Sequence, residues 1–253
     1  MALLEISFFS RSIGLSSRMS VIVSDQGSGP FPVFYLLHGL SDDCSTWLRR
    51  TSIERYVSGV PLIVVMPETG RGWYTNAETP AGRPYEDHLI KDVIPFVDRL
   101  LPTVARREGR VVGGLSMGGY GAIKSALKFP NLFCAANSHS GVVMTPLHKP
   151  ETRPKELQPL SPEFQAIFGE SWRGGDNDPL ALAKNCPLQP RPALRLDCGT
   201  GDFLLEQNRE FHAHLNALRF PHEYEEFPGE HTWSYWDLHS QEALAFHRRV
   251  LHI

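Results

Sequence analysis

Residues 114–119, with the sequence GLSMGG, decide the fold of this chain. They follow the short apolar run 110–113 and precede a helical pattern over 120–127. A strand, a tight glycine turn that carries a serine and then a helix form the context in which G-x-S-x-G places a nucleophile. The same letters also occur in ordinary glycine-rich turns, so the partners of the serine must be found as well. The stretch predicts Ser116 as a nucleophile at a helix start, whose free N–H groups attract negative charge.

Short apolar runs alternate with helical patterns over the rest of the 253 residues. Strands that alternate with helices form a mostly parallel sheet with helices on both faces. Together with the serine turn, this pattern predicts a single α/β-hydrolase domain over residues 1–253. The segments 5–10 and 19–24 are expected to pair antiparallel, and 222–227 is expected to be an edge strand. The other expected strands are 32–37, 61–66, 111–112, 134–136 and 193–198, and the expected helices are 86–101 with a kink at Pro95, 118–129, 204–218 and 235–251.

Residues 142–192 interrupt this alternation. The segment is rich in proline, lysine, glutamate and glycine, and only 162–168 and 179–182 have helical patterns. An insertion here projects from the strand ends beside Ser116, where loops usually build the site. We interpret it as a small cap over the site; a surface excursion without a role is the alternative.

A serine nucleophile needs a general base, and the base needs an acid that orients it. In an α/β-hydrolase the three groups follow in the order serine, acid, histidine, each just after a strand. Asp202 lies in the loop after the expected strand 193–198, and His231 lies in the loop after 222–227. The sequence therefore predicts Ser116, Asp202 and His231 as a catalytic triad.

Other acidic and histidine residues fit these roles less well. Asp197 lies inside a strand, which favours a structural role, and Glu206 falls in the next helix as a weaker candidate acid. Glu230 adjoins His231, and a sequence neighbour rarely turns back onto the same imidazole. The other histidines that we considered are interpreted as surface or packing residues: His139, His222, His239, His247 and His252.

An oxyanion hole requires two N–H donors. Met117 supplies the first because it follows the nucleophile, and the second is expected from the loop after strand 32–37. Gly39 permits a backbone turn in that loop, which leaves the N–H of Leu40 as the natural second donor. His38 precedes the turn and is interpreted as a residue that shapes the loop by hydrogen bonding.

The net charge of −3 comes without a basic run, which argues against nucleic acid or an anionic membrane as a partner. The N-terminal residues lack the pattern of a signal peptide, and no apolar run approaches the roughly 18 residues of a membrane helix. The four cysteines show no C-x-x-C spacing, which favours a reduced, cytoplasmic protein, with one disulfide left open. A small-molecule substrate suits this composition. The oligomeric state stays open, with a homo-oligomer among the options.

Six motifs together resemble the putative-esterase (esterase D-like) family, most closely its tributyrin esterase branch. The resemblance runs from the first strands through His231, which is nearly the whole chain. The motifs are YLLHG at 35–39, STWL at 45–48, VVMP at 64–67, GWYT at 72–75, GLSMGGYG at 114–121 and GTGD at 199–202.

The resemblance implies a serine carboxylesterase that hydrolyses short acyl esters, without a metal ion or an organic cofactor. Ser116, Asp202 and His231 match the triad of the family, and Leu40 and Met117 match its oxyanion donors.

Trp73 and Tyr74 match an aromatic pair near the substrate pocket of the family, and core packing is an equally strong interpretation. S-formylglutathione hydrolases of the same family typically carry histidine before the nucleophile, where this chain has Leu115. Thioester hydrolysis and acyl transfer to another acceptor are therefore kept as alternatives. A catalytically silent binding module on the same fold is the alternative outside enzymology.

Overall fold

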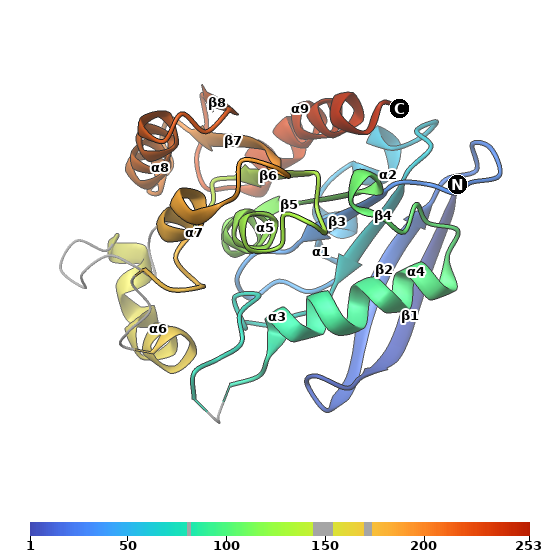
Figure 1. Ribbon diagram of the computed structural model, residues 1–253, viewed down its shortest axis with the longest axis horizontal. Helices are drawn as coiled ribbons and strands as arrows, with labels where there is room; N and C mark the ends of the chain where they lie inside the picture. Colours follow the sequence, from blue (N-terminus) through green and yellow to red (C-terminus); the bar gives the residue numbers. More distant parts are fainter. Residues whose placement is uncertain (80–81, 144–153, 170–173) are drawn as a thin grey trace.

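The computed structural model describes residues 1–79, 82–143, 154–169 and 174–253, and its centre is one eight-stranded sheet (Figure 1). The strand order is β1-β2-β4-β3-β5-β6-β7-β8. β1 pairs antiparallel with β2 and β2 antiparallel with β4, whereas every later neighbour is parallel. The strands are β1 (Ala2–Ser10), β2 (Leu15–Val23), β3 (Val33–Leu37), β4 (Ile63–Pro67), β5 (Arg110–Leu115), β6 (Ala135–His139), β7 (Ala193–Gly199) and β8 (His222–Phe227).

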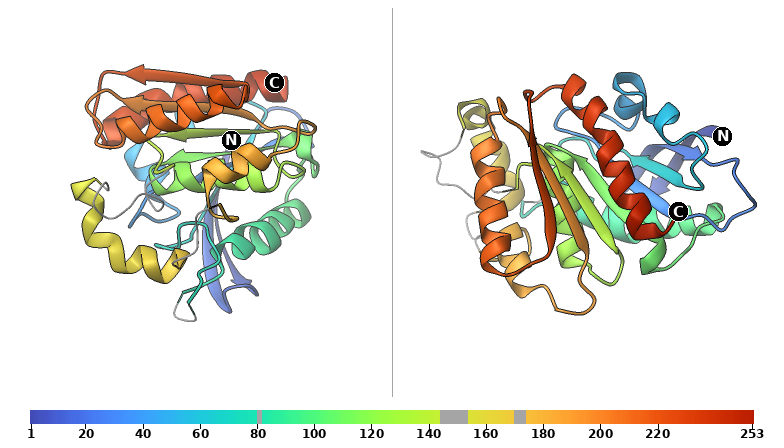
Figure 2. Two further views of the ribbon diagram at one scale, coloured as in Figure 1. Left: turned by 60° about the vertical axis from the view of Figure 1, so that its left-hand side comes forward. Right: turned by 90° about the horizontal axis from the view of Figure 1, so that it is seen from above.

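Helices cover both faces of the sheet (Figure 2). α4, α5 and α8 pack on one face around one apolar cluster, and α1, α2 and α9 pack on the other around a second cluster. The helices are α1 (Thr46–Arg50), α2 (Ile53–Tyr56), α3 (Tyr85–Asp87), α4 (Ile94–Leu100), α5 (Met117–Lys128), α6 (Ser161–Phe168), α7 (Pro179–Asn185), α8 (Leu205–Ala217) and α9 (Trp233–Leu251), with the π-helix η1 (His88–Val93) and the 3₁₀ helices η2 (Arg107–Gly109) and η5 (Lys155–Leu160).

The four central strands explain why this sheet folds as a layer between helices. Every residue of β3, β4, β5 and β6 is buried, as expected for parallel strands that are covered on both faces. α5 crosses this region, and only its last residue, Lys128, is not fully buried. The mostly parallel sheet and the edge position of β8 were predicted from the sequence, and the structure confirms both.

The predicted helix 86–101 is present, but its geometry differs from a simple proline kink. α3, η1 and α4 follow one another without a break, and the π-helical turns of η1 end just before Pro95. Proline has no N–H group and its ring collides with the carbonyl four residues earlier in an α-helix. The wider π-turns relieve that conflict, so Pro95 falls in the first turn of α4. The short helices α1 and α2 were not predicted.

Part of the predicted cap 142–192 lies outside the described residues, namely 144–153 and 170–173. The described part holds η5, α6 and α7. α6 packs on the body of the protein, where the rings of Phe164 and Phe168 lie 5.0 and 6.0 Å from the ring of Trp73. Its function as a cap stays a prediction.

A buried histidine in α9 gives the fold a testable dependence on pH. His247 is fully buried beside Phe34, and its Nε2 lies 2.8 Å from the side-chain oxygen of Asn137. Burial lowers the pKa of His247 to about 3. The folded protein therefore excludes a proton that the unfolded chain binds below the ordinary histidine pKa of about 6.5.

We expect the wild type to lose stability as the pH falls from about 6.5 towards 3, because the unfolded state gains a proton at position 247 and the folded state does not. The expected loss from this residue is about 2 kcal/mol at pH 5, at roughly 1.4 kcal/mol per pH unit. Urea unfolding of wild type and His247→Gln at pH 7 and pH 5 measures it. The variant should lack this part of the pH dependence, whereas the exposed control His252→Asn should retain it. Equal pH dependence in wild type and His247→Gln would contradict the assignment.

Candidate active site

Ser116 stands at the sharp turn between β5 and α5, with φ 52° and ψ −115°. Residues with a side chain rarely adopt such a conformation, which costs on the order of 1–3 kcal/mol and needs support from its surroundings. The support is visible in the hydrogen bonds. The N–H of Ser116 donates to the carbonyl of His139 at 3.0 Å, and its carbonyl accepts from the N–H groups of Tyr120 and Val142 at 3.0 and 3.2 Å.

Two glycines let the turn lie against the end of β3. A Cβ atom on Gly118 would lie 2.4 Å from the carbonyl oxygen of Leu37, and one on Gly114 would lie 2.6 Å from the same oxygen. Real Cβ atoms do not approach backbone oxygens so closely, and main-chain atoms cannot move aside as a flexible side chain can. The glycines of the motif are therefore required by the close packing of β3, β5 and α5.

The three residues of the predicted triad come together at the carboxyl ends of β5, β7 and β8. The Nε2 atom of His231 lies 3.0 Å from Oγ of Ser116. Its Nδ1 atom lies 2.9 and 3.1 Å from the two carboxylate oxygens of Asp202. Since a carboxylate only accepts, Nδ1 carries the proton, and the lone pair of Nε2 faces the serine hydroxyl. This arrangement can move a proton from Ser116 to His231.

The surroundings of His231 and Asp202 restrict how they can move. The His231 ring lies 4.6 Å from the ring of Phe203 and 4.8 Å from that of Trp236. Asp202 is buried, and its Oδ1 accepts the N–H of Leu204 at 2.8 Å. Sequence reasoning missed both aromatic residues, although Phe203 directly follows the acid and Trp236 lies one helical turn beyond Thr232.

The alternative acids lie elsewhere. Glu206 has a 77% exposed side chain and pairs with Arg209 at 2.7 Å. Asp197 is fully buried and accepts the hydroxyl of Tyr235 at 3.0 Å, while His139 contacts its carboxylate at 2.8 Å. The structural role that the strand position predicted for Asp197 agrees with these contacts. The other candidate residues differ in burial. His139, His239 and His247 are buried, His222 is half-buried, and Glu230 and His252 are exposed.

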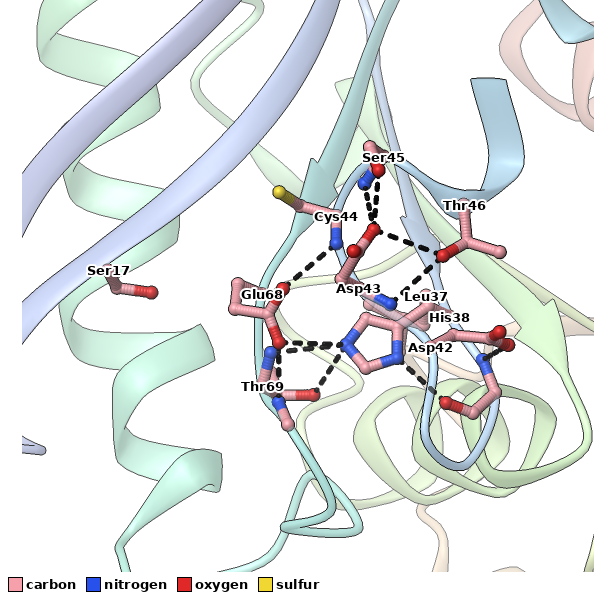
Figure 3. Close-up of polar contacts among 12 residues, drawn as sticks. Ser17, Leu37, His38, Asp42, Asp43, Cys44, Ser45, Thr46, Glu68 and Thr69 are labelled. Carbon is pink, nitrogen blue, oxygen red and sulfur yellow. Dashed lines mark hydrogen bonds and ion pairs between the residues drawn. The ribbon is translucent and has the colours of Figure 1, made fainter. Parts of the chain in front are cut away.

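The loop after β3, which carries the proposed second oxyanion donor, lies against the turn that holds Ser116. A Cβ atom on Gly39 would lie 2.6 Å from Cδ1 of Leu115. Leu40 is half-buried and follows Gly39, and Met117 is buried at the first position of α5. His38 is buried behind the loop, with Nδ1 2.8 Å from the Gly39 carbonyl (Figure 3). The loop-shaping role predicted for His38 agrees with this contact.

Trp73 and Tyr74 are 1% and 0% exposed, so the structure places both in the core. The indole N–H of Trp73 donates to Oε1 of Glu163 in α6 at 3.3 Å, and the hydroxyl of Tyr74 donates to the His38 carbonyl at 3.0 Å. Core packing, which the sequence left as an equal interpretation, describes what these residues contact. Arg71 also binds Glu163, and its guanidinium donates to the hydroxyl of Ser41 in the loop after β3.

The remaining predictions concern metals, membranes and cysteines. Across residues 1–79, 82–143, 154–169 and 174–253, no three His, Cys, Asp or Glu side chains gather closely enough to hold a metal ion. In the same part of the chain, no helix has the length and apolar character needed to cross a membrane. All four cysteines belong to the described residues and are unpaired: Cys44, Cys134, Cys186 and Cys198.

Known proteins resemble this chain in sequence and in fold. The profile of the family described as Putative esterase matches residues 12–247. An acetyl esterase of Caldicellulosiruptor saccharolyticus is 26% identical over an alignment that covers 99% of each chain. Esterase Rv1288 of Mycobacterium tuberculosis is 30% identical over 89% of this chain, which spans only 55% of that longer relative.

Two solved structures from Staphylococcus aureus cover 97% of this chain and 98% of their own at 30% identity. One is FphF, described as a fluorophosphonate-binding serine hydrolase, with a TM-score of 0.84. The other is the S-formylglutathione hydrolase FrmB, with a TM-score of 0.81. The fold is thus that of the α/β-hydrolase esterases, as predicted.

This chain belongs to the putative esterase family, and it is a carboxylic ester hydrolase. The family that the sequence motifs indicated is confirmed, whereas its tributyrin esterase branch stays a prediction.

Proposed function

We propose that this protein is a serine carboxylesterase that hydrolyses short-chain acyl esters through a covalent acyl-enzyme. One observation carries the proposal. The hydrogen-bonded series from Oγ of Ser116 through His231 to Asp202 joins a strained nucleophile, a correctly oriented base and a buried acid. Such a series activates a hydroxyl that is otherwise a weak nucleophile.

The mechanism follows from these positions. Ser116 attacks the ester carbonyl while Nε2 of His231 takes its proton, and Asp202 stabilises the imidazolium that forms. The carbonyl oxygen becomes negative, and the N–H groups of Leu40 and Met117 are proposed to bind it. The bond to the alcohol then breaks as His231 returns the proton to the leaving oxygen. Water, activated by the same histidine, releases the acid from Ser116.

The short acyl preference is supported by the packing of α6. The rings of Phe164 and Phe168 lie against Trp73, and Glu163 binds both Trp73 and Arg71, so this helix is attached to the body beside the oxyanion loop. We propose that a helix held in this way limits the room for a long acyl chain. The similarity to an acetyl esterase points in the same direction. The unpaired cysteines fit the reducing cytoplasm that the composition predicts.

Thioester hydrolysis is the second candidate, and the similarity to FrmB favours it. Against it, position 115, before the nucleophile, is a buried leucine. Activity with S-formylglutathione and p-nitrophenyl acetate, measured on one enzyme preparation, decides between the two. A kcat/KM for the thioester that is far above that for the ester would show that the protein is a thioesterase.

The choice of acid is tested by a matched pair of variants. Asp202→Asn should lower kcat by roughly 10³- to 10⁴-fold, because an amide favours the wrong tautomer of His231. Glu206→Gln removes a charge from the same loop-helix region but from an exposed side chain, and it should leave kcat within about twofold. Hydrolysis of p-nitrophenyl acetate measures both. A larger loss in Glu206→Gln than in Asp202→Asn would show that the wrong acid has been assigned.

The acyl preference is tested with p-nitrophenyl esters from acetyl to dodecanoyl. Each methylene that fits the pocket adds about 0.8 kcal/mol of binding, and one that does not fit adds a steric cost. We expect kcat/KM to be highest between acetyl and butyryl and to fall well before octanoyl. A preference for decanoyl or longer esters, or strong activation by an oil–water interface, would contradict the proposal and favour a lipase.

A further inference from the structure

Side chains form hydrogen bonds to two successive peptide groups of the loop after β3, at residues 38–40, which we call the oxyanion loop. The peptide between His38 and Gly39 is bound on both sides, because its carbonyl accepts the hydroxyl of Tyr74 at 3.0 Å and its N–H donates to Oδ2 of Asp42 at 3.2 Å. Glycine permits rotation that other residues resist, so these two bonds hold a peptide that is otherwise free to turn.

The next peptide, between Gly39 and Leu40, is held by the His38 ring. The N–H of Thr69 lies 3.2 Å from Nε2, so Nε2 accepts and Nδ1 carries the proton (Figure 3). Nδ1 then donates to the carbonyl of Gly39 at 2.8 Å. In a trans peptide the N–H points opposite to the carbonyl. The N–H of Leu40 therefore points away from the His38 ring, and its direction depends on where His38 stands.

Tyr74 lies in the connection between β4 and α3 and packs against α5. It is 0% exposed, and its ring occupies the space that the missing side chain of Gly121 leaves, since a Cβ there would lie 2.4 Å from the ring. Burial raises the pKa of Tyr74 far above the neutral range, so its hydroxyl keeps the proton and donates it.

A buried lysine of α5 holds the main chain of Tyr74. Lys124 is 0% exposed, and its Nζ donates to the Tyr74 carbonyl at 2.6 Å, to Oγ1 of Thr75 at 3.2 Å and to Oε2 of Glu86 at 2.7 Å. Burial lowers the pKa of Lys124 to about 8, which still leaves it charged at neutral pH. α5 begins directly after Ser116, so the helix that carries the nucleophile also fixes Tyr74.

We propose that Tyr74 is a positioning residue for the oxyanion hole: it joins the nucleophile helix to the oxyanion loop through Lys124 on one side and the His38 carbonyl on the other. This inference rests on the proposed function, because it assumes that the N–H of Leu40 binds the oxyanion. Tyr74 acts on the site without contact with the substrate. The residue aligns one of the two donors with the position of Ser116.

Tyr74→Phe tests the proposal because it removes only the hydroxyl and keeps the buried ring. Loss of an entire oxyanion donor costs on the order of 10²- to 10³-fold in kcat, so a misaligned donor should cost less, about 10- to 100-fold. KM for p-nitrophenyl acetate should change little. The affinity for a trifluoromethyl ketone, which forms a tetrahedral adduct with the serine, should fall by the same factor as kcat/KM.

Tyr35→Phe is the matched control. Tyr35 is also 0% exposed and lies on β3, three residues before His38, with its ring edge-on against Phe133. This variant should retain wild-type kcat and inhibitor affinity. Active-site titration with a fluorophosphonate ensures that rates are compared per folded enzyme.

Three results would overturn the inference: a kcat/KM of Tyr74→Phe within twofold of wild type, an equal loss in Tyr35→Phe, or a loss confined to KM. Ser116→Ala, assayed in parallel, separates this inference from the function on which it rests. Loss of activity in Ser116→Ala with an unchanged Tyr74→Phe overturns the inference alone. Esterase activity that survives in Ser116→Ala overturns the proposed function and the inference together.

Discussion

The strained main chain of Ser116 is the constraint on which the rest of the site depends. Its positive φ angle turns the chain from β5 into α5 within one residue. The turn is possible only because Gly114 and Gly118 let β3, β5 and α5 meet backbone to backbone. The hydroxyl is thereby presented at the edge of the sheet, and the free N–H groups of the first helical turn lie beside it. The apolar burial of the central strands offsets the free-energy cost of the strained backbone at Ser116.

The parallel sheet explains how residues far apart in sequence reach that hydroxyl. Carboxyl ends of parallel strands share one edge, so the loops after β3, β5, β7 and β8 meet there. The loop after β3 supplies the proposed donor Leu40, and the loops after β7 and β8 supply Asp202 and His231. Buried polar contacts then set the orientation of each group. The Nδ1 proton of His231 is directed to Asp202, and that of His38 to the carbonyl of Gly39.

The sequence could single out Ser116, Asp202 and His231, which the structure places within hydrogen-bonding distance of one another, because each is marked by a local signal. A glycine-serine turn after a buried strand, and polar residues just after later strands, are visible in single stretches of sequence. Other features depend on contacts between distant segments, which no local pattern contains. The link from Lys124 to Tyr74 spans 50 residues, and that from Trp73 to Glu163 spans 90. For this reason the sequence left a pocket role and core packing as equal interpretations for Trp73 and Tyr74, while the structure shows both buried in the core. The π-helical turns before Pro95 escaped prediction for a different reason, since helical patterns do not distinguish π from α geometry.

Covalent labelling can show whether Ser116 is the nucleophile. The protein is treated with a fluorophosphonate, and intact mass, residual esterase activity and the labelled peptide are measured on the same sample. We expect one phosphonyl group per chain, located on Ser116, with activity lost in proportion to labelling. Ser116→Ala should take up no label. Complete inactivation with the label on another residue, or an active and labelled Ser116→Ala, would contradict the assignment of Ser116 as the nucleophile.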